Sequence, residues 1–542
     1  MSQNNNNSRR IQTLVSHLEK EGAEAEERLS RQNTAAASTA PKKIGTTEEG
    51  AAVAKGLGGS NEENPYAIES EFVDLDNLGI PMVGTDADLA EDYVAGLNAM
   101  SERVDPKTKM GYVDTVESGH VLLLCHPKSI TKVLTTSVQH FLGGLRPPSA
   151  AFFGPKVLFV LEGREWLDLR NVLKKTFQKH NIALMSEDTY EAMDKFEMIL
   201  DRYAQAGQDV DFMRLLGCYH IQAIGQVAFH TDLKVLETFD DGENVIEQSF
   251  EYLLEELPRR AYATDYDVQN DYESDTPDNR MMAQMSYQVR NVIRQIIAKR
   301  LADQAAGIQT PIDLLETMMN VFVEQYPEAK GDVEMLTAEL GDNLVEIMFA
   351  GYNTAVPTTA HAFLFVSQRP DLQDRIIEEV DRVLQGRRPT QEDLPNLVLC
   401  ERVVMEALRL CPPASQLARQ TTRDLVLEGV PIPRATRVWI PACYVHRDPE
   451  YWTEPNAFDP DRWENKPVRG SFVPFSDGAR NCAGRNFAMW ESVCAIATLF
   501  QKYRVKPADD YDWKTIFTGF GLRPFDLTEA RVCVRLNVIP RE

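Results

Sequence analysis

The sequence predicts a protein of the α+β class that is mainly helical and carries only small sheets. Apolar residues recur at helical spacing through most of the chain after residue 165, whereas β-prone runs are short and few. The helical patterns cover residues 165–180, 186–206, 245–258, 281–303, 311–325, 333–367, 371–384, 397–410 and 485–502.

The β-prone runs lie in three parts of the chain. Residues 113–116 and 121–124 are joined by a Glu-Ser-Gly-His sequence, which is typical of a hairpin. Residues 411–480 are irregular and punctuated by proline, with a short strand expected at 436–440. Further β-like segments follow the last helical pattern and close the chain.

Length and charge exclude several classes of protein. The 542 residues carry 57 Lys and Arg against 82 Asp and Glu, and the net charge of −25 argues against a general nucleic-acid binder. No apolar run approaches the ~18–20 residues of a bilayer-spanning helix. The opening residues match neither a secretory signal nor a transit peptide. Eight cysteines without a CxxC pair indicate a reduced interior.

The composition changes near residue 62. At ~100–200 residues per domain, the length predicts three or four units. Residues 1–62 hold no aromatic residue and no cysteine, so we expect a disordered or weakly helical extension. Within it, four apolar residues from Ile11 to Leu18 fit either a membrane-surface or partner helix or a fraying helix in a tail. Residues 263–279 hold six carboxylates and are expected to form a solvated loop.

One loop carries the strongest chemical signal. Residues 475–484 run straight into the last predicted helix and contain Cys482, where backbone N–H groups and the helix dipole would lower the pKa of a thiol. Gly478 permits a tight turn, Gly484 lets a flat ligand approach the backbone, and Arg480 offers a fork for a carboxylate. A thiolate, a cleared face and a carboxylate clamp suit a haem that carries propionates. The alternative is an inert buried thiol, which is our interpretation of the other seven cysteines.

This loop resembles the haem-binding loop of the cytochrome P450 superfamily. The family pattern of Phe, Gly, Arg, Cys and Gly is matched by Phe475, Gly478, Arg480, Cys482 and Gly484. Further family motifs follow in the expected order. The resemblance implies a mainly α cytochrome P450 fold over residues 63–542, with helices that sandwich the haem and with Cys482 as the axial ligand of its iron.

A second motif of the family is Glu-x-x-Arg, matched by Glu406 and Arg409. The i, i+3 spacing puts both charges on one helix face, although such pairs are common on exposed helices. A downstream Phe-Asp-Pro-Asp-Arg-Trp sequence makes the pair similar to the family's buried network, in which Arg462 joins Glu406 and Arg409. The resemblance assigns the three residues to assembly of the site.

Trp166 and Arg170 match the family's Trp-x-x-x-Arg motif, whose side chains bind a haem propionate. The alternative is an amphipathic helix with a core tryptophan. Arg419 lies where the family often has another arginine for a propionate. The helix of Arg170 also carries a cluster of cations that either docks an acidic reductase or ferredoxin or is a solvated face. The cluster comprises Arg170, Lys174, Lys175 and Lys179.

Residues 350–354, Ala-Gly-Tyr-Asn-Thr, lie within the long apolar pattern of 333–367. In the family, the equivalent turn lies above the iron, and there a Thr and an acidic neighbour deliver protons to dioxygen. Gly351 and Thr354 fit, but Asn353 replaces the acid, and an amide cannot exchange a proton as a carboxyl does. The alternative is a Thr that only bonds the carbonyl four residues back. Pro357 has no N–H for the Asn353 carbonyl, so we expect the helix to open there.

By family position, four residues are expected to line an apolar substrate cavity. They are Phe349, Ala350, Leu417 and Phe520, the last in a segment that resembles the family's substrate-facing hairpin tip.

The resemblance implies a monooxygenase that inserts one oxygen atom of dioxygen into a C–H bond of a hydrophobic substrate, with fatty acids and terpenoids as candidates. The cofactor would be haem b, reduced by NAD(P)H indirectly through a separate reductase or ferredoxin. Two alternatives stay open: a hydroperoxide isomerase or dehydratase, which typically lacks the Thr, and a non-catalytic haem sensor. Peripheral membrane contact is compatible with the sequence, and so is a cytoplasmic or organellar location.

Overall fold

By its contacts the chain divides into two units, Met1–Asn64 and Pro65–Glu542, and all of the described residues lie in the second. The interpretations of residues 1–62, and of 263–275 in the acidic loop, lie outside the described residues. The computed structural model describes residues 73–541 except 86–87, 90–91, 116–118, 137–140, 143–151, 155, 178–185, 243, 262–275 and 519–520.

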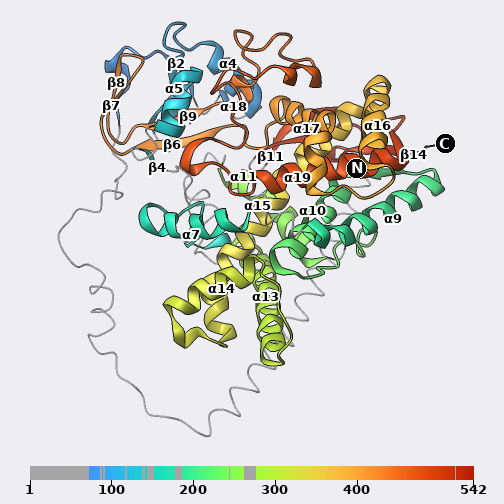
Figure 1. Ribbon diagram of the computed structural model, residues 1–542. Coiled ribbons are helices and arrows are strands. Elements are labelled where there is room, and N and C mark those ends of the chain that lie inside the picture. The colour runs from blue at the N-terminus through green and yellow to red at the C-terminus, as the bar shows by residue number, and fades with distance from the viewer. Residues whose placement is uncertain are drawn as a thin grey trace, which may run out of the picture. The chain divides into compact units, whose positions relative to one another are not determined.

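Helices make up most of this unit (Figure 1), as the apolar periodicity predicts. No helix in the described part of the chain is both long and apolar enough to cross a bilayer. The α-helices are α4 (Tyr93–Glu102), α5 (Pro127–Thr131), α7 (Gly163–Thr176), α9 (Tyr190–Ala206), α10 (Phe212–Phe229), α11 (Val245–Ala261), α13 (Pro277–Ala305), α14 (Leu314–Gln325), α15 (Val333–Ser367), α16 (Pro370–Leu384), α17 (Val398–Leu410), α18 (Ala442–Val445) and α19 (Arg485–Lys502).

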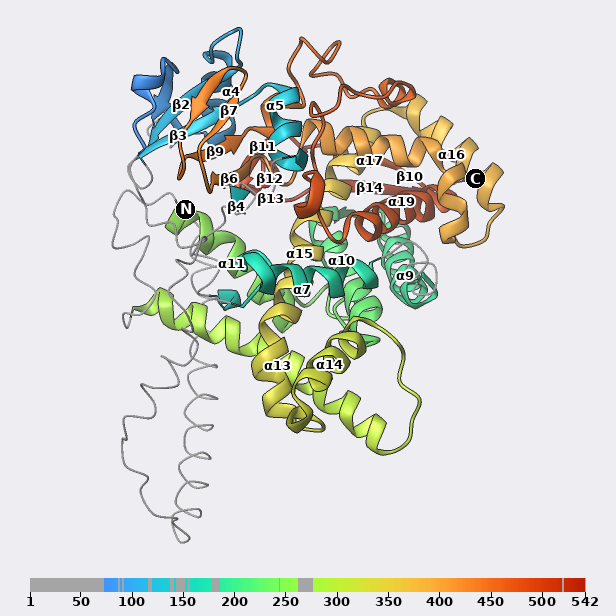
Figure 2. The same cartoon turned by 60° about the vertical axis from the view of Figure 1, so that its left-hand side comes forward.

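The strands form small sheets, and the largest gathers with α4 and α5 at one end of the unit, away from α13 and α14 (Figures 1 and 2). It has the order β1-β2-β3-β9-β6-β4, and three smaller sheets have the orders β10-β14-β5, β11-β12-β13 and β7-β8. The strands are β1 (Met82–Thr85), β2 (Met110–Thr115), β3 (Gly119–Leu124), β4 (Phe141–Leu142), β5 (Asp209–Asp211), β6 (Leu417–Thr421), β7 (Leu425–Leu427), β8 (Val430–Ile432), β9 (Arg437–Ile440), β10 (Tyr503–Pro507), β11 (Trp513–Thr518), β12 (Gly521–Asp526), β13 (Arg531–Val532) and β14 (Arg535–Pro540).

The predicted hairpin is confirmed: β2 and β3 pair antiparallel, with Thr115 opposite Gly119. The sequence patterns miss α10 because it is buried on every side. All of its residues except Arg214 are buried, so it lacks the polar face that makes a helix periodic. The Asp211 side chain caps it by accepting a hydrogen bond from the Met213 N–H at 3.0 Å.

Helix α15 passes through the core and packs against α10, α13, α17 and α19. The expected opening at Pro357 is wrong, because α15 is one continuous helix from Val333 to Ser367 with Pro357 inside it. A proline removes one backbone hydrogen bond. Packing of the buried helix on its neighbours holds the helical path across that gap.

A buried charge network joins α17 to the irregular chain that leads to the cysteine loop. The Glu406 carboxylate accepts hydrogen bonds from Arg409 at 2.7 and 2.9 Å, from Arg462 at 2.8 Å and from the Trp463 indole at 3.0 Å. Glu406 and Arg409 are both 0% exposed. Arg409 also donates to the carbonyl of His446 at 3.1 Å. Every charge in the network therefore has partners, as burial requires.

The network continues into the cysteine loop through His446. Its Nε2 accepts a hydrogen bond from the Val473 N–H at 2.9 Å, which requires an unprotonated nitrogen. Burial, and then the charge of Arg409, lower the pKa of His446 to about 3. The imidazole therefore stays neutral and keeps its acceptor at physiological pH.

Replacing Glu406 by Gln should destabilise the fold by about 3–5 kcal/mol, because Arg409 and Arg462 would be left buried without a counter-charge. Glu464→Gln is the matched control, since Glu464 forms an exposed pair with Arg402 that should contribute less than about 1 kcal/mol. Denaturant unfolding of both variants measures the difference. Equal losses of stability would contradict the assigned importance of the network.

Candidate active site

The cysteine loop is held by its own backbone and by one close contact. The Cys482 N–H donates to the carbonyl of Phe475 at 2.9 Å. Gly478 has a φ of +72°, and a Cβ there would lie 2.1 Å from the carbonyl oxygen of Leu134, so only glycine fits. A Cβ on Gly484 would meet nothing within 4 Å, which leaves the backbone open to a flat group.

Cys482 differs in exposure from every other cysteine. It is exposed, while the other seven are buried. Surrounding protein raises the pKa of the thiol, whereas the N–H groups of Gly484 and Arg485 and the charge of Arg170 lower it. The net shift is upward, which corrects the expectation that the helix terminus alone would depress this pKa. The sulfur nevertheless has the hydrogen-bond donors and cation that a bound thiolate needs.

Helix α7 faces the cysteine loop with both residues of its Trp-x-x-x-Arg motif. The guanidinium of Arg480 lies 4.2 Å from the centre of the Trp166 ring and forms an ion pair with Glu162. Arg170 is buried and donates a hydrogen bond to the side-chain oxygen of Asn481. The structure thus brings Trp166, Arg170 and Arg480 together beside Cys482.

Arg419 on β6 completes a cluster of cations. It is 8% exposed and donates to Ser476 Oγ at 3.0 Å, while its Nε has no hydrogen-bond partner in the described part of the structure. Burial, and then the charge of Arg480, lower the pKa of Arg419 to about 10. A buried guanidinium beside a second one calls for an additional anion.

The donor set around Cys482 fits a haem. An exposed sulfur with backbone donors suits an iron ligand, an open Gly484 backbone suits a flat ring, and a buried arginine with a spare donor suits a propionate. Glu162, Asn481 and Ser476, which orient the arginines, were missed by the sequence analysis. The only signal for Glu162 was its position four residues before Trp166.

One face of α15 is open although most of the surrounding helix is buried. Ala350 and Gly351 are half-buried and Thr354 is exposed. The Thr354 hydroxyl donates to the Ala350 carbonyl at 2.9 Å, the ordinary bond of a helical threonine. Asn353 faces elsewhere: it is buried, and its Oδ1 accepts a hydrogen bond from Arg523 at 3.1 Å.

The expected substrate residues lie in different surroundings. Phe349 is 1% exposed and packs against Phe153 and Phe250, with ring centres 5.0 and 5.3 Å away, so its ring belongs to the core. Leu417 on β6 is half-buried. Phe520 lies outside the described residues.

Glu346 on α15 supports the chain just before α7. Its carboxylate oxygens accept hydrogen bonds from the N–H groups of Leu158 and Phe159, both at 2.8 Å. Burial raises the pKa of Glu346 to about 7, against the opposing effect of these two donors. The folded state therefore binds a proton there more tightly than the unfolded chain does.

This raised pKa predicts a loss of stability with rising pH. The contribution of Glu346 is fully present below pH 4.5 and disappears as the pH rises through about 7, a change of roughly 3 kcal/mol. Glu346→Gln should flatten the pH dependence of the unfolding midpoint between pH 5 and 8. The control is Glu339→Gln, because Glu339 also lies on α15 but is more exposed and pairs with Lys156. An unchanged pH profile in Glu346→Gln would contradict the assignment.

Comparisons with known proteins agree with this geometry. A family model described as Cytochrome P450 matches residues 109–527. One relative is cyclooctat-9-en-7-ol 5-monooxygenase from Streptomyces melanosporofaciens, to which the chain is 26% identical. The alignment covers 71% of this chain and 80% of the relative. The chain is 27% identical to cytochrome P450 3A25 from Mus musculus, in an alignment that covers 72% of this chain and 78% of the relative. It is 36% identical to pentalenene oxygenase from Streptomyces avermitilis, in an alignment that covers 33% of this chain and 40% of the relative. With its family match spanning most of the described residues and with its exposed cysteine set among arginines, the chain belongs to the cytochrome P450 family.

Proposed function

We propose that the chain inserts one oxygen atom of dioxygen into a C–H bond of an apolar substrate, with electrons from a separate redox protein. The reaction consumes dioxygen, two electrons and two protons, and it yields the alcohol and water. The observation that carries the proposal is the combination of an exposed Cys482 among arginines with an open face of α15 around Thr354.

Haem b is the cofactor that these residues would hold. Cys482 would ligate the iron, and Arg170, Arg419 and Arg480 would bind the propionates together with Trp166. When bound, the group supplies thiolate-ligated iron that activates dioxygen. Thr354 would hold a proton at its exposed hydroxyl, because a hydroxyl both donates and accepts hydrogen bonds.

Asn353 is best assigned to support, not to proton exchange. Its Oδ1 is engaged by Arg523, which lies 3.8 Å from the Glu251 carboxylate, and Glu251 also accepts a hydrogen bond from Tyr352. The amide is thereby held in one orientation by Arg523. The presence of Thr354, with an exposed side chain, favours the monooxygenase over the isomerase alternative, which typically lacks this threonine.

The proposed substrate is an apolar cyclic alkene or alkenol of terpenoid type. The names of two relatives, cyclooctat-9-en-7-ol 5-monooxygenase and pentalenene oxygenase, support this choice over a fatty acid. The half-buried Ala350 and Leu417 are compatible with an apolar ligand, which gains about 25 cal/mol per Å² of apolar surface it buries.

Electrons would enter on the cysteine side, near the end of α7. There the Phe177 ring lies 6.1 Å from the Phe487 ring, and the Asn486 amide donates to the Phe177 carbonyl at 3.5 Å. Lys174, one turn earlier, is exposed and available to an acidic partner. Arg170 is withdrawn from the expected docking cluster because it is buried against Asn481. Lys179 and the Lys175 side chain lie outside the described part of the structure.

Product formation from a candidate terpene alkene, with and without a reductase system, tests the function. We expect an alcohol product only when reductase, NAD(P)H and dioxygen are all present. Conversion of a hydroperoxide without reductase would favour the isomerase, and haem binding without any product would favour the sensor.

In the same assay, Lys174→Glu should slow reduction of the iron roughly tenfold at low salt and weaken the dependence of its rate on ionic strength. Lys330→Glu, at an exposed position in a turn before α15, is the charge-matched control and should leave both unchanged. The docking site would be wrong if the two variants were reduced at equal rates.

A further inference from the structure

A second cysteine lies in a cluster with the composition of a reactive thiol site. Cys411 follows α17, is 1% exposed, and has its Sγ 3.8 Å from the hydroxyl oxygen of Thr515 on β11. That hydroxyl is 3.5 Å from Nε2 of His361 on α15. The electrostatic influence of His361 also reaches the thiol. Three segments far apart in the sequence thus bring a thiol, a hydroxyl and an imidazole into contact.

The tautomer of His361 follows from its other nitrogen. Nδ1 lies 2.7 Å from the carbonyl oxygen of Pro357. A carbonyl can only accept, so Nδ1 carries a proton, and in the neutral ring Nε2 is left as an acceptor for the Thr515 hydroxyl. Once the ring takes up the thiol proton it is a cation, and this cation stabilises the thiolate. A nucleophile, a base and a group that orients the base are the parts of an activated thiol.

Among the eight cysteines, Cys411 alone has a thiol pKa that its surroundings lower. Burial raises the pKa of its thiol, but the imidazole of His361, the guanidinium of Arg447 and the hydroxyl of Thr515 together outweigh burial, and the net shift is downward. In contrast, burial raises the pKa values of Cys125 and Cys443 to about 12. The remaining five cysteines are also shifted upward.

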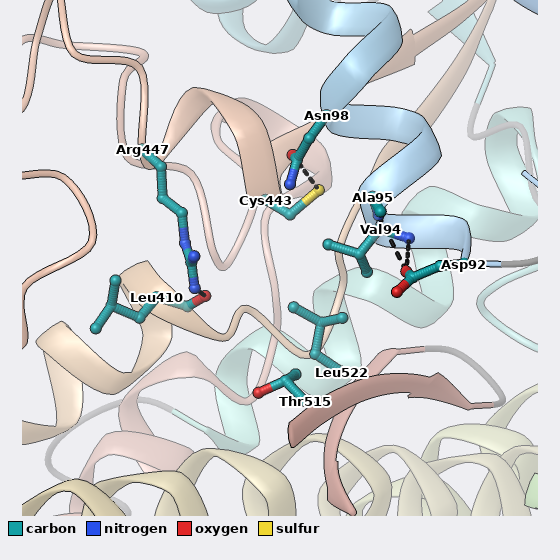
Figure 3. A pocket seen from close by; sticks show the side chains of 9 residues that line it. All are labelled: Asp92, Val94, Ala95, Asn98, Leu410, Cys443, Arg447, Thr515 and Leu522. Atoms are coloured by element: carbon teal, nitrogen blue, oxygen red, sulfur yellow. Dashed lines mark hydrogen bonds between the residues drawn. The ribbon is translucent and has the colours of Figure 1, made fainter. Parts of the chain in front are cut away.

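Thr515 is the member of this cluster that lines a cavity of about 280 Å³, whose wall is drawn in Figure 3. Thr515 and Arg447, which both act on Cys411, belong to its wall, and so does Leu410, the chain neighbour of Cys411. Cys443 lines the same cavity, where its Sγ lies 3.7 Å from Asn98 Oδ1. The polar groups of Asn98, Thr515 and Arg447 offer hydrogen bonds to a small polar molecule. Thr515 both lines the cavity and contacts the Cys411 sulfur.

We propose that Cys411 is a modification site at which hydrogen peroxide, admitted through this cavity, oxidises the thiol to sulfenic acid. The sulfur attacks one peroxide oxygen, a sulfur–oxygen bond forms and the oxygen–oxygen bond breaks. The sulfur loses two electrons and the peroxide gains them. The thiol proton passes to Nε2 of His361 and then to the departing hydroxide, which leaves as water. The site is independent of the oxygen insertion proposed above.

The test is site-resolved mass spectrometry of the holoenzyme, with the iron blocked by imidazole so that it does not consume the peroxide. Hydrogen peroxide is added and sulfenic acid is trapped with dimedone. We expect dimedone to label Cys411 at least roughly tenfold faster than Cys443. Cys443 is a stringent internal control because it is about as buried as Cys411 and itself lines the cavity.

Variants then test the role of the cluster. His361→Gln should slow labelling of Cys411 roughly tenfold and leave Cys443 unchanged. Thr515→Val, at a less buried position, should also slow the labelling of Cys411. It replaces His361→Gln as the test if that variant does not fold. Equal labelling of Cys411 and Cys443 in the unmodified chain would overturn the proposal, and so would labelling of Cys411 at an unchanged rate in both variants.

Discussion

The buried carboxylate of Glu406 is the interaction on which the architecture of the site depends. It satisfies two arginines and an indole at once, and those groups belong to α17 and to the irregular chain after α18. Arg409 extends the network to the carbonyl of His446, whose neutral ring receives the N–H of Val473. The chain that enters the cysteine loop is therefore fixed by hydrogen bonds and charge, in a region with little regular secondary structure.

The loop so fixed places one exposed sulfur close to a cluster of arginines. The charge of Arg170 lowers the pKa of the Cys482 thiol. Arg480 lies close enough to Arg419 that its charge lowers the pKa of Arg419. Such a concentration of positive charge in a chain of net charge −25 is costly unless an anion joins it. A porphyrin with two carboxylates and an iron that takes a thiolate matches both the charge and the open backbone at Gly484.

Much of this could be predicted from the sequence, because motif residues with fixed spacing lie on rigid elements. The amphipathic helices, the β2–β3 hairpin and the partners of Glu406 follow from periodicity and from the family pattern. Helix α10 could not be predicted because burial on all sides removes its polar face. The continuity of α15 through Pro357 was missed because tertiary packing overrides a local preference.

The orientation of single side chains also escaped the sequence. Helical spacing allows Arg170 to join either the cysteine loop or the expected cation cluster, and only the structure shows it buried against Asn481. In the same way, Asn353 turns to Arg523, a residue 170 positions away. The pKa of Glu346 is raised by burial and partly lowered again by backbone N–H groups from another segment of the chain. These contacts are long-range, and a single sequence does not reveal them.

The most direct measurement of the central claim, that Cys482 donates the sulfur ligand of a haem iron, is the absorption spectrum of the reduced protein under carbon monoxide. The intact chain should show the red-shifted band of a thiolate-ligated haem. Cys482→Ser should lose that band, while Cys443→Ser keeps it. Retention of the thiolate band by Cys482→Ser would contradict the account.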